Sequence, residues 1–191
     1  MAGRPRASSQ RMLEEAASEL FLEQGYAKTT IEQITRRAGV SRNTFFNYFP
    51  GKADLLWVEL DASRTVLTDA LAAAPADTDP LAAVEAALAT TAAALTPGRA
   101  PLVLTQWRVM GIDEELKAAG LARALAHADV VEAFLVGRGL DALVARAIGL
   151  AVIGAASAAV GRWAADGPER RPLGTYLQKV VHPVLEGFGI G

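Results

Sequence analysis

The stretch from Thr29 to Lys52 constrains the fold of this chain more than any other. Thr29 or Thr30 is suited to cap a helix, because a threonine oxygen accepts hydrogen bonds from the free N–H groups of a first turn. Gly39 favours the left-handed backbone that ends this helix, and Ser41 is placed to cap a second short helix. The spacing therefore predicts a helix-turn-helix, whose second helix can enter a DNA major groove.

The predicted second helix carries side chains that are suited to contact DNA. Arginine pairs with guanine, asparagine pairs with adenine, and threonine or an aromatic edge can meet the thymine methyl group. Tyr48 and Lys52 are better placed for phosphates, which fix position without specifying sequence. With the threonines of the first helix, the predicted DNA-binding residues are Thr29, Thr30, Ser41, Arg42, Asn43, Thr44, Phe46, Asn47, Tyr48 and Lys52. The alternative is an ordinary helical hairpin with solvated polar side chains, and an exposed Phe46 beside Tyr48 disfavours it.

The run from Arg11 to Leu56 resembles the N-terminal DNA-binding domain of the tetracycline-repressor (TetR) family. The order of features is the same: a helix that ends at Gly25-Tyr26, a Thr-Thr pair, the turn Ala38-Gly39-Val40-Ser41, and then TFFNYF. The family often carries tyrosine where this chain has Phe46, so a phosphate contact from that position is in doubt. Both the helical pattern and the resemblance predict an all-α fold of about nine helices, three of them N-terminal.

Composition and charge agree with this interpretation. Hydrophobic residues make up 51% of the chain and aromatic residues only 6%, which favours packed helices. Residues 1–52 hold 8 Lys and Arg against 5 Asp and Glu, whereas residues 53–191 hold 11 against 16. The basic end is therefore the candidate for facing DNA.

The absence of cysteine excludes disulfides and predicts a cytoplasmic protein. The uncharged run 147–161 is shorter than the about 20 residues of a membrane span, so we expect a buried helix and no membrane partner.

The chain is predicted to form two domains. Residues 1–52 would form the helix-turn-helix DNA-binding domain, and residues 53–191 a helical ligand-binding and dimerisation domain. A continuous fourth helix over residues 53–74 would join them. The arm of residues 1–8, with Arg4 and Arg6, either contacts DNA or is a solvated terminus. The remaining predicted helices cover residues 81–96, 101–110, 113–136, 140–165 and 173–188.

The last two long helices are predicted to form a homodimer interface. Small residues dominate 147–161 and permit close helix packing. A four-helix bundle made by two subunits, which the resemblance also implies, would bury both helices. The expected interface residues are Ile148, Ala151, Gly154, Ala155, Ala158, Val181, Val184 and Leu185. The alternative is a core within one chain. A dimer would place two recognition helices about 34–36 Å apart, as a palindromic operator requires.

The middle helices are expected to enclose a pocket for a small-molecule effector. Apolar and aromatic walls with one cation are the usual composition of such a site. The candidate lining residues are Leu104, Trp107, Arg108, Met110, Phe134 and Trp163. Each of them could instead be an ordinary core or surface residue. The stretch from Trp163 to Gly167 faintly resembles TetR members suspected of sensing fatty-acyl compounds.

The predicted function is a homodimeric transcriptional repressor that binds a double-stranded DNA operator and is released by a small amphipathic or hydrophobic effector. An enzyme is disfavoured, because His127 and His182 are the only histidines and no phosphate-binding glycine loop is present. No catalytic residue, metal or cofactor is predicted. A helical carrier that does not bind DNA remains as a further alternative.

Overall fold

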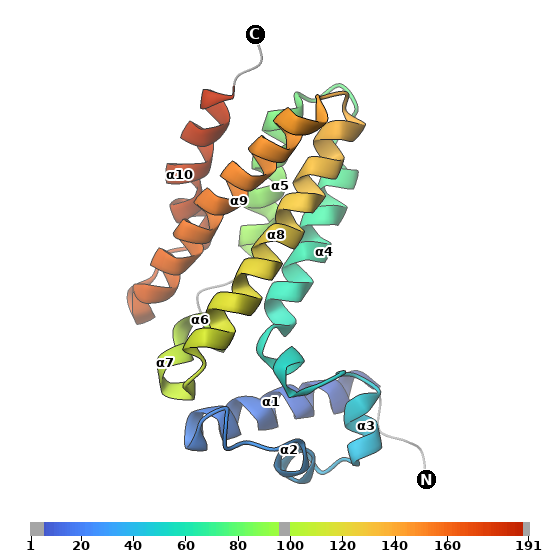
Figure 1. The fold of residues 1–191 in the computed structure, drawn as a ribbon, viewed down its shortest axis with the longest axis vertical. Helices are drawn as coiled ribbons and strands as arrows, with labels where there is room; N and C mark the ends of the chain where they lie inside the picture. The colour runs from blue at the N-terminus through green and yellow to red at the C-terminus, as the bar shows by residue number, and fades with distance from the viewer. Residues whose placement is uncertain (1–5, 96–99, 189–191) are drawn as a thin grey trace. The chain divides into compact units, whose positions relative to one another are not determined.

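The computed structural model describes residues 6–95 and 100–188 (Figure 1). These residues form ten α-helices and no strand, which confirms the all-α prediction. The chain divides into two compact units. The N-terminal unit comprises the residues up to Val58 together with Pro101–Leu116, and the bundle unit comprises Glu59–Ala100 and the residues from Lys117 onward. A segment from the middle of the sequence therefore belongs to the N-terminal unit.

The N-terminal unit is built from short helices around an aromatic and aliphatic core. Its elements are α1 (Arg6–Gln24), α2 (Ile31–Ala38), α3 (Arg42–Phe46), the 3-10 helix η1 (Lys52–Leu56), α6 (Leu102–Thr105) and α7 (Trp107–Met110). Its core includes Leu13, Phe21, Ile34, Phe45, Phe49, Val103 and Met110, which are all buried. Arg6 begins α1, so the end of the predicted arm is helical, whereas Arg4 lies outside the described residues.

The predicted continuous helix over residues 53–74 is wrong. The structure has η1 up to Leu56 and a separate helix α4 (Val58–Ala72). Trp57 lies between them with φ −116° and ψ 4°, outside the α-helical region, and its side chain is buried. The apolar spacing continues through both pieces, which explains why the sequence pattern did not reveal the break.

The bundle unit consists of five long helices. They are α4, α5 (Pro80–Ala94), α8 (Asp113–Gly137), α9 (Ala142–Ala165) and α10 (Leu173–Gly187), with the short η3 (Gly167–Glu169) between the last two. α10 packs against α9 and α5. The first residues of α8 belong to the N-terminal unit. The helix predicted over residues 81–96 is α5, which ends at Ala94; residue 96 lies outside the described residues.

Helix α9 is only partly buried. By length and composition alone it is the one described helix that could cross a membrane, which is weak evidence because core helices of soluble proteins pass the same test. Only 33% of its most apolar window is buried within the chain. Leu143 is 78% exposed and Leu150 is 41% exposed. The prediction of a helix buried on several sides is therefore met only on the side that faces α8 and α10.

Two histidines of the bundle unit are predicted to change stability with pH in opposite directions. Burial lowers the pKa of His127 below its ordinary value of 6.5, and the nearby Arg64 adds to this while the carbonyl of Arg123 and the carboxylate of Asp61 oppose it. Hydrogen bonding to Glu85, with the nearby charge of Glu186, raises the pKa of His182 above 6.5.

The signs follow from proton linkage. The unfolded chain protonates His127 before the folded one does, so its contribution to stability is present above pH 6.5 and is lost as the pH falls through its folded pKa. The contribution of His182 is full below pH 6.5 and is lost as the pH rises through its folded pKa. In urea unfolding between about pH 5 and 8, His127→Gln should reduce the loss of stability on acidification, and His182→Gln should increase it. Equal pH profiles for the two variants would contradict this.

Candidate nucleic-acid interface

The turn between α2 and α3 forms as its sequence predicts. Thr30 caps α2 by accepting a hydrogen bond from the backbone N–H of Gln33 at 3.2 Å. Gly39 adopts φ 65° and ψ 34°, a left-handed conformation that penalises a side chain. Ser41 caps α3 by accepting from the N–H of Thr44 at 3.0 Å. The expectations that Thr29 or Thr30 would cap α2 and that Ser41 would cap α3 are confirmed, with Thr30 as the first cap.

Helix α3 presents polar side chains and one aromatic ring to the surface. We call this set the reading surface; its members are Ser41, Arg42, Asn43, Thr44, Phe46, Asn47 and Tyr48. Thr44 and Tyr48 are half-buried and the other five are exposed. The guanidinium of Arg42 lies 5.6 Å from the centre of the Phe46 ring, which is 46% exposed. On the opposite side of the helix, Phe45 is fully buried and anchors α3 to the core.

Helix α3 is shorter than the expected helix that ends near Tyr48. It ends at Phe46, and Asn47 is its C-terminal cap. The N–H groups of Tyr48 and Phe49 both donate to the carbonyl of Phe45, at 3.0 Å each, so the chain tightens into a turn there. The reading surface therefore consists of one short helix and the turn that follows it.

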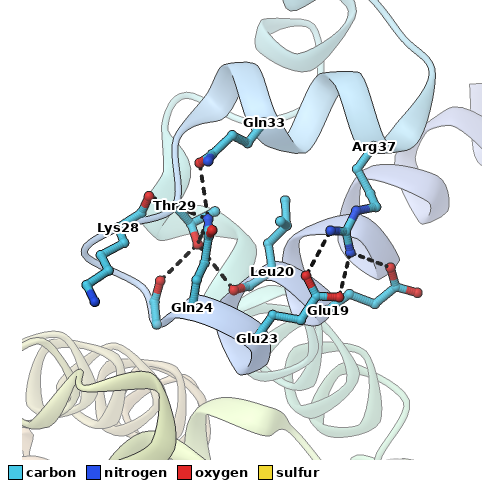
Figure 2. Close-up of polar contacts among 9 residues, drawn as sticks. Glu19, Leu20, Glu23, Gln24, Lys28, Thr29, Gln33 and Arg37 are labelled. Atoms are coloured by element: carbon cyan, nitrogen blue, oxygen red, sulfur yellow. Dashed lines mark hydrogen bonds and ion pairs between the residues drawn. The ribbon is translucent and has the colours of Figure 1, made fainter.

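Thr29 does not belong to this surface. Its side chain is 1% exposed, and its hydroxyl lies 2.9 Å from the carbonyl oxygen of Gly25 and 3.3 Å from that of Leu20. The hydroxyl oxygen also accepts a hydrogen bond from the side-chain amide of Gln24 at 3.2 Å (Figure 2). The predicted DNA contact from this side chain is therefore corrected: Thr29 closes the loop between α1 and α2.

Lys52 also has internal partners that its sequence position did not suggest. Its ammonium group donates to the carbonyl oxygens of Tyr26 at 2.7 Å and Thr29 at 2.8 Å. The same group lies 4.0 Å from the centre of the Tyr26 ring. This placement does not support the predicted phosphate contact and gives Lys52 a structural role, in which it joins η1 to the loop between α1 and α2.

A matched substitution tests this role. Lys52→Met keeps the length of the side chain but removes its donors, and we expect it to lower the free energy of unfolding by about 1–2 kcal/mol, allowing for partial solvent exposure. Lys28→Met is the control, because Lys28 is exposed and its side chain has no partner among the described residues. Urea unfolding followed by circular dichroism measures both. Equal stability of the two variants would contradict the structural role.

Arg37 is a residue whose role the sequence did not reveal. From α2 its guanidinium donates to both carboxylate oxygens of Glu23 at 2.8 Å and to Glu19 at 3.2 Å, both on α1 (Figure 2). These hydrogen bonds lower the pKa of the Glu23 carboxyl. Two carboxylates thus offset its charge, so Arg37 links α1 to α2 and is not an uncompensated cation for DNA.

A second missed feature is the amide of Gln33. Its side-chain oxygen accepts from the backbone N–H of Thr30 at 2.8 Å and from the amide of Gln24 at 3.2 Å (Figure 2). With the cap from the Thr30 hydroxyl this is a capping box. A threonine followed three residues later by glutamine is the sequence signal for it. Reciprocal hydrogen bonds between Thr30 and Gln33 therefore stabilise the N-terminus of α2.

The predicted effector-pocket residues are divided between the two units. Leu104, Trp107, Arg108 and Met110 belong to the N-terminal unit, whereas Phe134 and Trp163 belong to the bundle unit. Met110 is buried as a core residue. Trp163 is fully buried, and its indole N–H donates to the carbonyl of Arg171 at 3.0 Å. Met110 and Trp163 are therefore corrected to core residues of their respective units.

The predicted dimer residues divide in a similar way. Ile148, Val181 and Leu185 are buried within the bundle unit, so their assignment to an intersubunit surface is corrected. The other five lie on exposed or half-buried positions of α9 and α10: Ala151, Gly154, Ala155, Ala158 and Val184.

Family models match most of this chain. The model for bacterial regulatory proteins of the tetR family matches residues 13–57, and the model for the MftR C-terminal domain matches residues 78–189. The second match alone covers more than half of the 191 residues. The chain belongs to the TetR family. The matched N-terminal model describes bacterial regulatory proteins, and the chain spans less than half the length of the curated relatives it matches.

Curated relatives agree with this assignment, and solved structures share the fold. This chain is 39% identical over 71 residues to the HTH-type transcriptional regulator TcmR of Streptomyces glaucescens. The aligned stretch covers 37% of this chain and 31% of TcmR. NalD of Pseudomonas aeruginosa, the secondary repressor of the MexAB-OprM efflux pump, shares the fold with a TM-score of 0.61 and 23% identity over 96% of this chain and 98% of NalD. FadR of Thermus thermophilus, a TetR-family repressor solved with lauroyl-CoA, has a TM-score of 0.58 and 24% identity over 95% and 96% of the two chains.

Proposed function

We propose that this TetR-family regulator is a cytoplasmic homodimeric repressor that binds a palindromic operator through the reading surface. The observation that carries the proposal is the outward exposure of Arg42 and Asn43 on α3, which Phe45 anchors, and of Asn47 at its C-terminal end. Arginine and asparagine make the bidentate contacts that distinguish guanine and adenine in the major groove. The exposed polar side chains are free to contact DNA bases, and the buried Phe45 ring fixes the orientation of the helix that carries them. Base recognition requires both.

The exposed side of α9 supports a homodimer. Leu150, Gly154 and Ala158 lie on exposed positions of this apolar helix, and a second copy of the same surface would cover them. The space around Gly154 is open, since apart from its own stretch of helix no described residue has an atom within 4 Å of where a β-carbon would stand, so a neighbouring helix could approach closely. We propose an interface centred on Ala151, Gly154, Ala155, Ala158 and Val184.

We further propose that a small amphipathic or hydrophobic effector releases the repressor from DNA. An effector shifts the equilibrium only by the difference between its affinities for the DNA-binding state and the released state. Because FadR of the same fold was solved with lauroyl-CoA, acyl-CoA thioesters are the first compounds to screen.

Fluorescence anisotropy with DNA from upstream of the protein's own coding region tests the proposal. We expect selective binding over a scrambled duplex of the same composition, weakening as salt rises because phosphate contacts release counterions. Sedimentation equilibrium on the same samples gives the stoichiometry, expected to be two chains per operator. Equal binding to both duplexes would reject operator recognition, and a monomer on the operator would reject the dimer. Absence of binding at low salt would favour a carrier function instead.

A further inference from the structure

Phe46 places an aromatic ring beside a cation on the reading surface. It follows Arg42 by four residues in α3, so the two side chains lie one turn apart on the same face of the helix. Long side chains on a helix lean toward its N-terminus, which brings the Phe46 ring toward Arg42. The centre of the guanidinium lies 5.6 Å from the centre of this ring. An aromatic face attracts a cation at this distance.

The position of the Phe46 ring is set from the core of the N-terminal unit. Phe46 packs edge-to-face against Phe45, with ring centres 5.3 Å apart and an interplanar angle of 82°. This is a preferred arrangement of two aromatic rings. Phe45 is fully buried, and its ring centre lies 5.7 Å from that of the buried Phe49. A series of ring contacts therefore leads from the core to the guanidinium of Arg42.

The guanidinium of Arg42 keeps its hydrogen-bond donors available. It is exposed, and it forms no hydrogen bond or ion pair within the described part of the chain. Another exposed arginine of the same unit, Arg36, is paired with Glu32. The Phe46 ring attracts the charge of Arg42 but offers no oxygen or nitrogen acceptor, so the five N–H donors of the guanidinium remain for a base. Arg42 is therefore restrained by a neighbour that does not use its donors.

A restrained arginine discriminates between bases better than a mobile one. A mobile side chain loses rotamer freedom when it binds a base, and this loss lowers its affinity. It can also turn to a nearby phosphate, and phosphate contacts carry no sequence information. A guanidinium that is already held on the outer face of α3 avoids both effects.

We infer that Phe46 is a positioning residue for operator recognition. Its ring holds the guanidinium of Arg42 in the direction in which it pairs with O6 and N7 of a guanine, the commonest specific contact of arginine in the major groove. The inference rests on the proposed function, and it specifies how the reading surface selects one base pair.

Phe46→Leu and Phe46→Tyr form the matched pair of variants that tests the inference. Leucine keeps an apolar side chain without a ring, whereas tyrosine keeps the ring. Fluorescence anisotropy of the full-length protein, with the operator and with duplexes in which each G·C pair is exchanged singly for A·T, gives the base preference. Phe46→Leu should lower the preference for one G·C pair by about twofold to fivefold, which is the strength of an exposed contact between a cation and a ring. Phe46→Tyr should retain the preference.

The Arg42→Ala background separates positioning from direct contact with DNA. The G·C pair affected by Phe46→Leu should be the pair at which Arg42→Ala loses its preference. Adding Phe46→Leu to Arg42→Ala should cause no further loss, because no guanidinium is left to orient. An equal loss in both backgrounds would show that the ring contacts DNA itself or acts through folding, and would overturn the inference.

The wild-type protein distinguishes failure of this inference from failure of the proposed function. If the wild type binds the operator and a scrambled duplex equally, operator recognition is rejected and the inference with it. Two results with a selective wild type would overturn the inference alone. They are a full base preference in Phe46→Leu, and a loss in Phe46→Tyr as large as that in Phe46→Leu.

Discussion

Gly149→Ala should lower the free energy of unfolding by roughly 1–2 kcal/mol, although alanine favours helices over glycine by about 1 kcal/mol. A β-carbon at position 149 would lie 2.8 Å from the backbone carbonyl oxygen of Ala128 and 3.5 Å from the backbone nitrogen of Glu132. Both are backbone atoms of α8, which cannot move away by a change of rotamer. α8 and α9 would have to separate, and the ion pairs of Arg146 with Asp129 and Glu132 span the same contact.

Gly154→Ala is the control on the same helix. Outside the adjacent turns of α9, no atom of the described residues lies within 4 Å of a β-carbon at position 154, so the helix preference alone should raise the free energy of unfolding, by up to about 1 kcal/mol. Urea unfolding of both variants at low protein concentration measures the difference, with the slope against urea as a check for two-state behaviour. Equal stability of the two variants would show that α8 and α9 do not approach as closely as the structure has them.

Arg42→Ala should weaken operator binding by roughly 1–3 kcal/mol, or about tenfold to a hundredfold, and relax the preference at one base pair. Arg42 is exposed at the first position of α3. Within the part of the chain that the structure describes, its guanidinium contacts only the ring of Phe46. Its removal should therefore affect DNA binding much more than folding.

Arg11→Ala is the matched control for the loss of one positive charge. The Arg11 side chain is 78% exposed on α1 and pairs with Glu15 one turn away, an interaction worth little. Anisotropy titrations of both variants at several salt concentrations, against the operator and against duplexes with single base-pair changes, separate base recognition from phosphate attraction. If both variants lose affinity equally at every sequence, Arg42 contacts phosphate and does not read a base.

Local signals in the sequence predicted the local structure of the N-terminal unit. Thr30, Gly39 and Ser41 act on the N–H and carbonyl groups nearest to them, so their roles follow from neighbouring residues alone. Long-range partners were not predictable in this way. Lys52 meets carbonyls 26 and 23 residues earlier in the chain, and nothing near Lys52 in the sequence indicates them.

The same distinction explains the errors in the bundle unit. Trp163 is a residue type that often lines ligand pockets. Only the packing of α9 and α10 shows that its ring is buried and that its N–H donates to the backbone carbonyl of Arg171. Ile148, Val181 and Leu185 share the apolar character of interface residues, and periodicity does not distinguish an internal face from an intersubunit face. The assignment of the DNA-binding residues and of the dimer interface therefore stays a prediction.

The segment Pro101–Leu116 determines how this protein can be recombined with its relatives. The N–H of Tyr26, in the loop after α1, donates to the carbonyl of Met110 at 2.9 Å, and Met110 is part of the N-terminal core. A chimaera that exchanges only the residues up to Val58 would therefore combine two halves of one core from different parents. To exchange the whole N-terminal unit, the gene must be cut near Val58 and also on both sides of Pro101–Leu116. The transferred coding sequence would therefore consist of two separate segments.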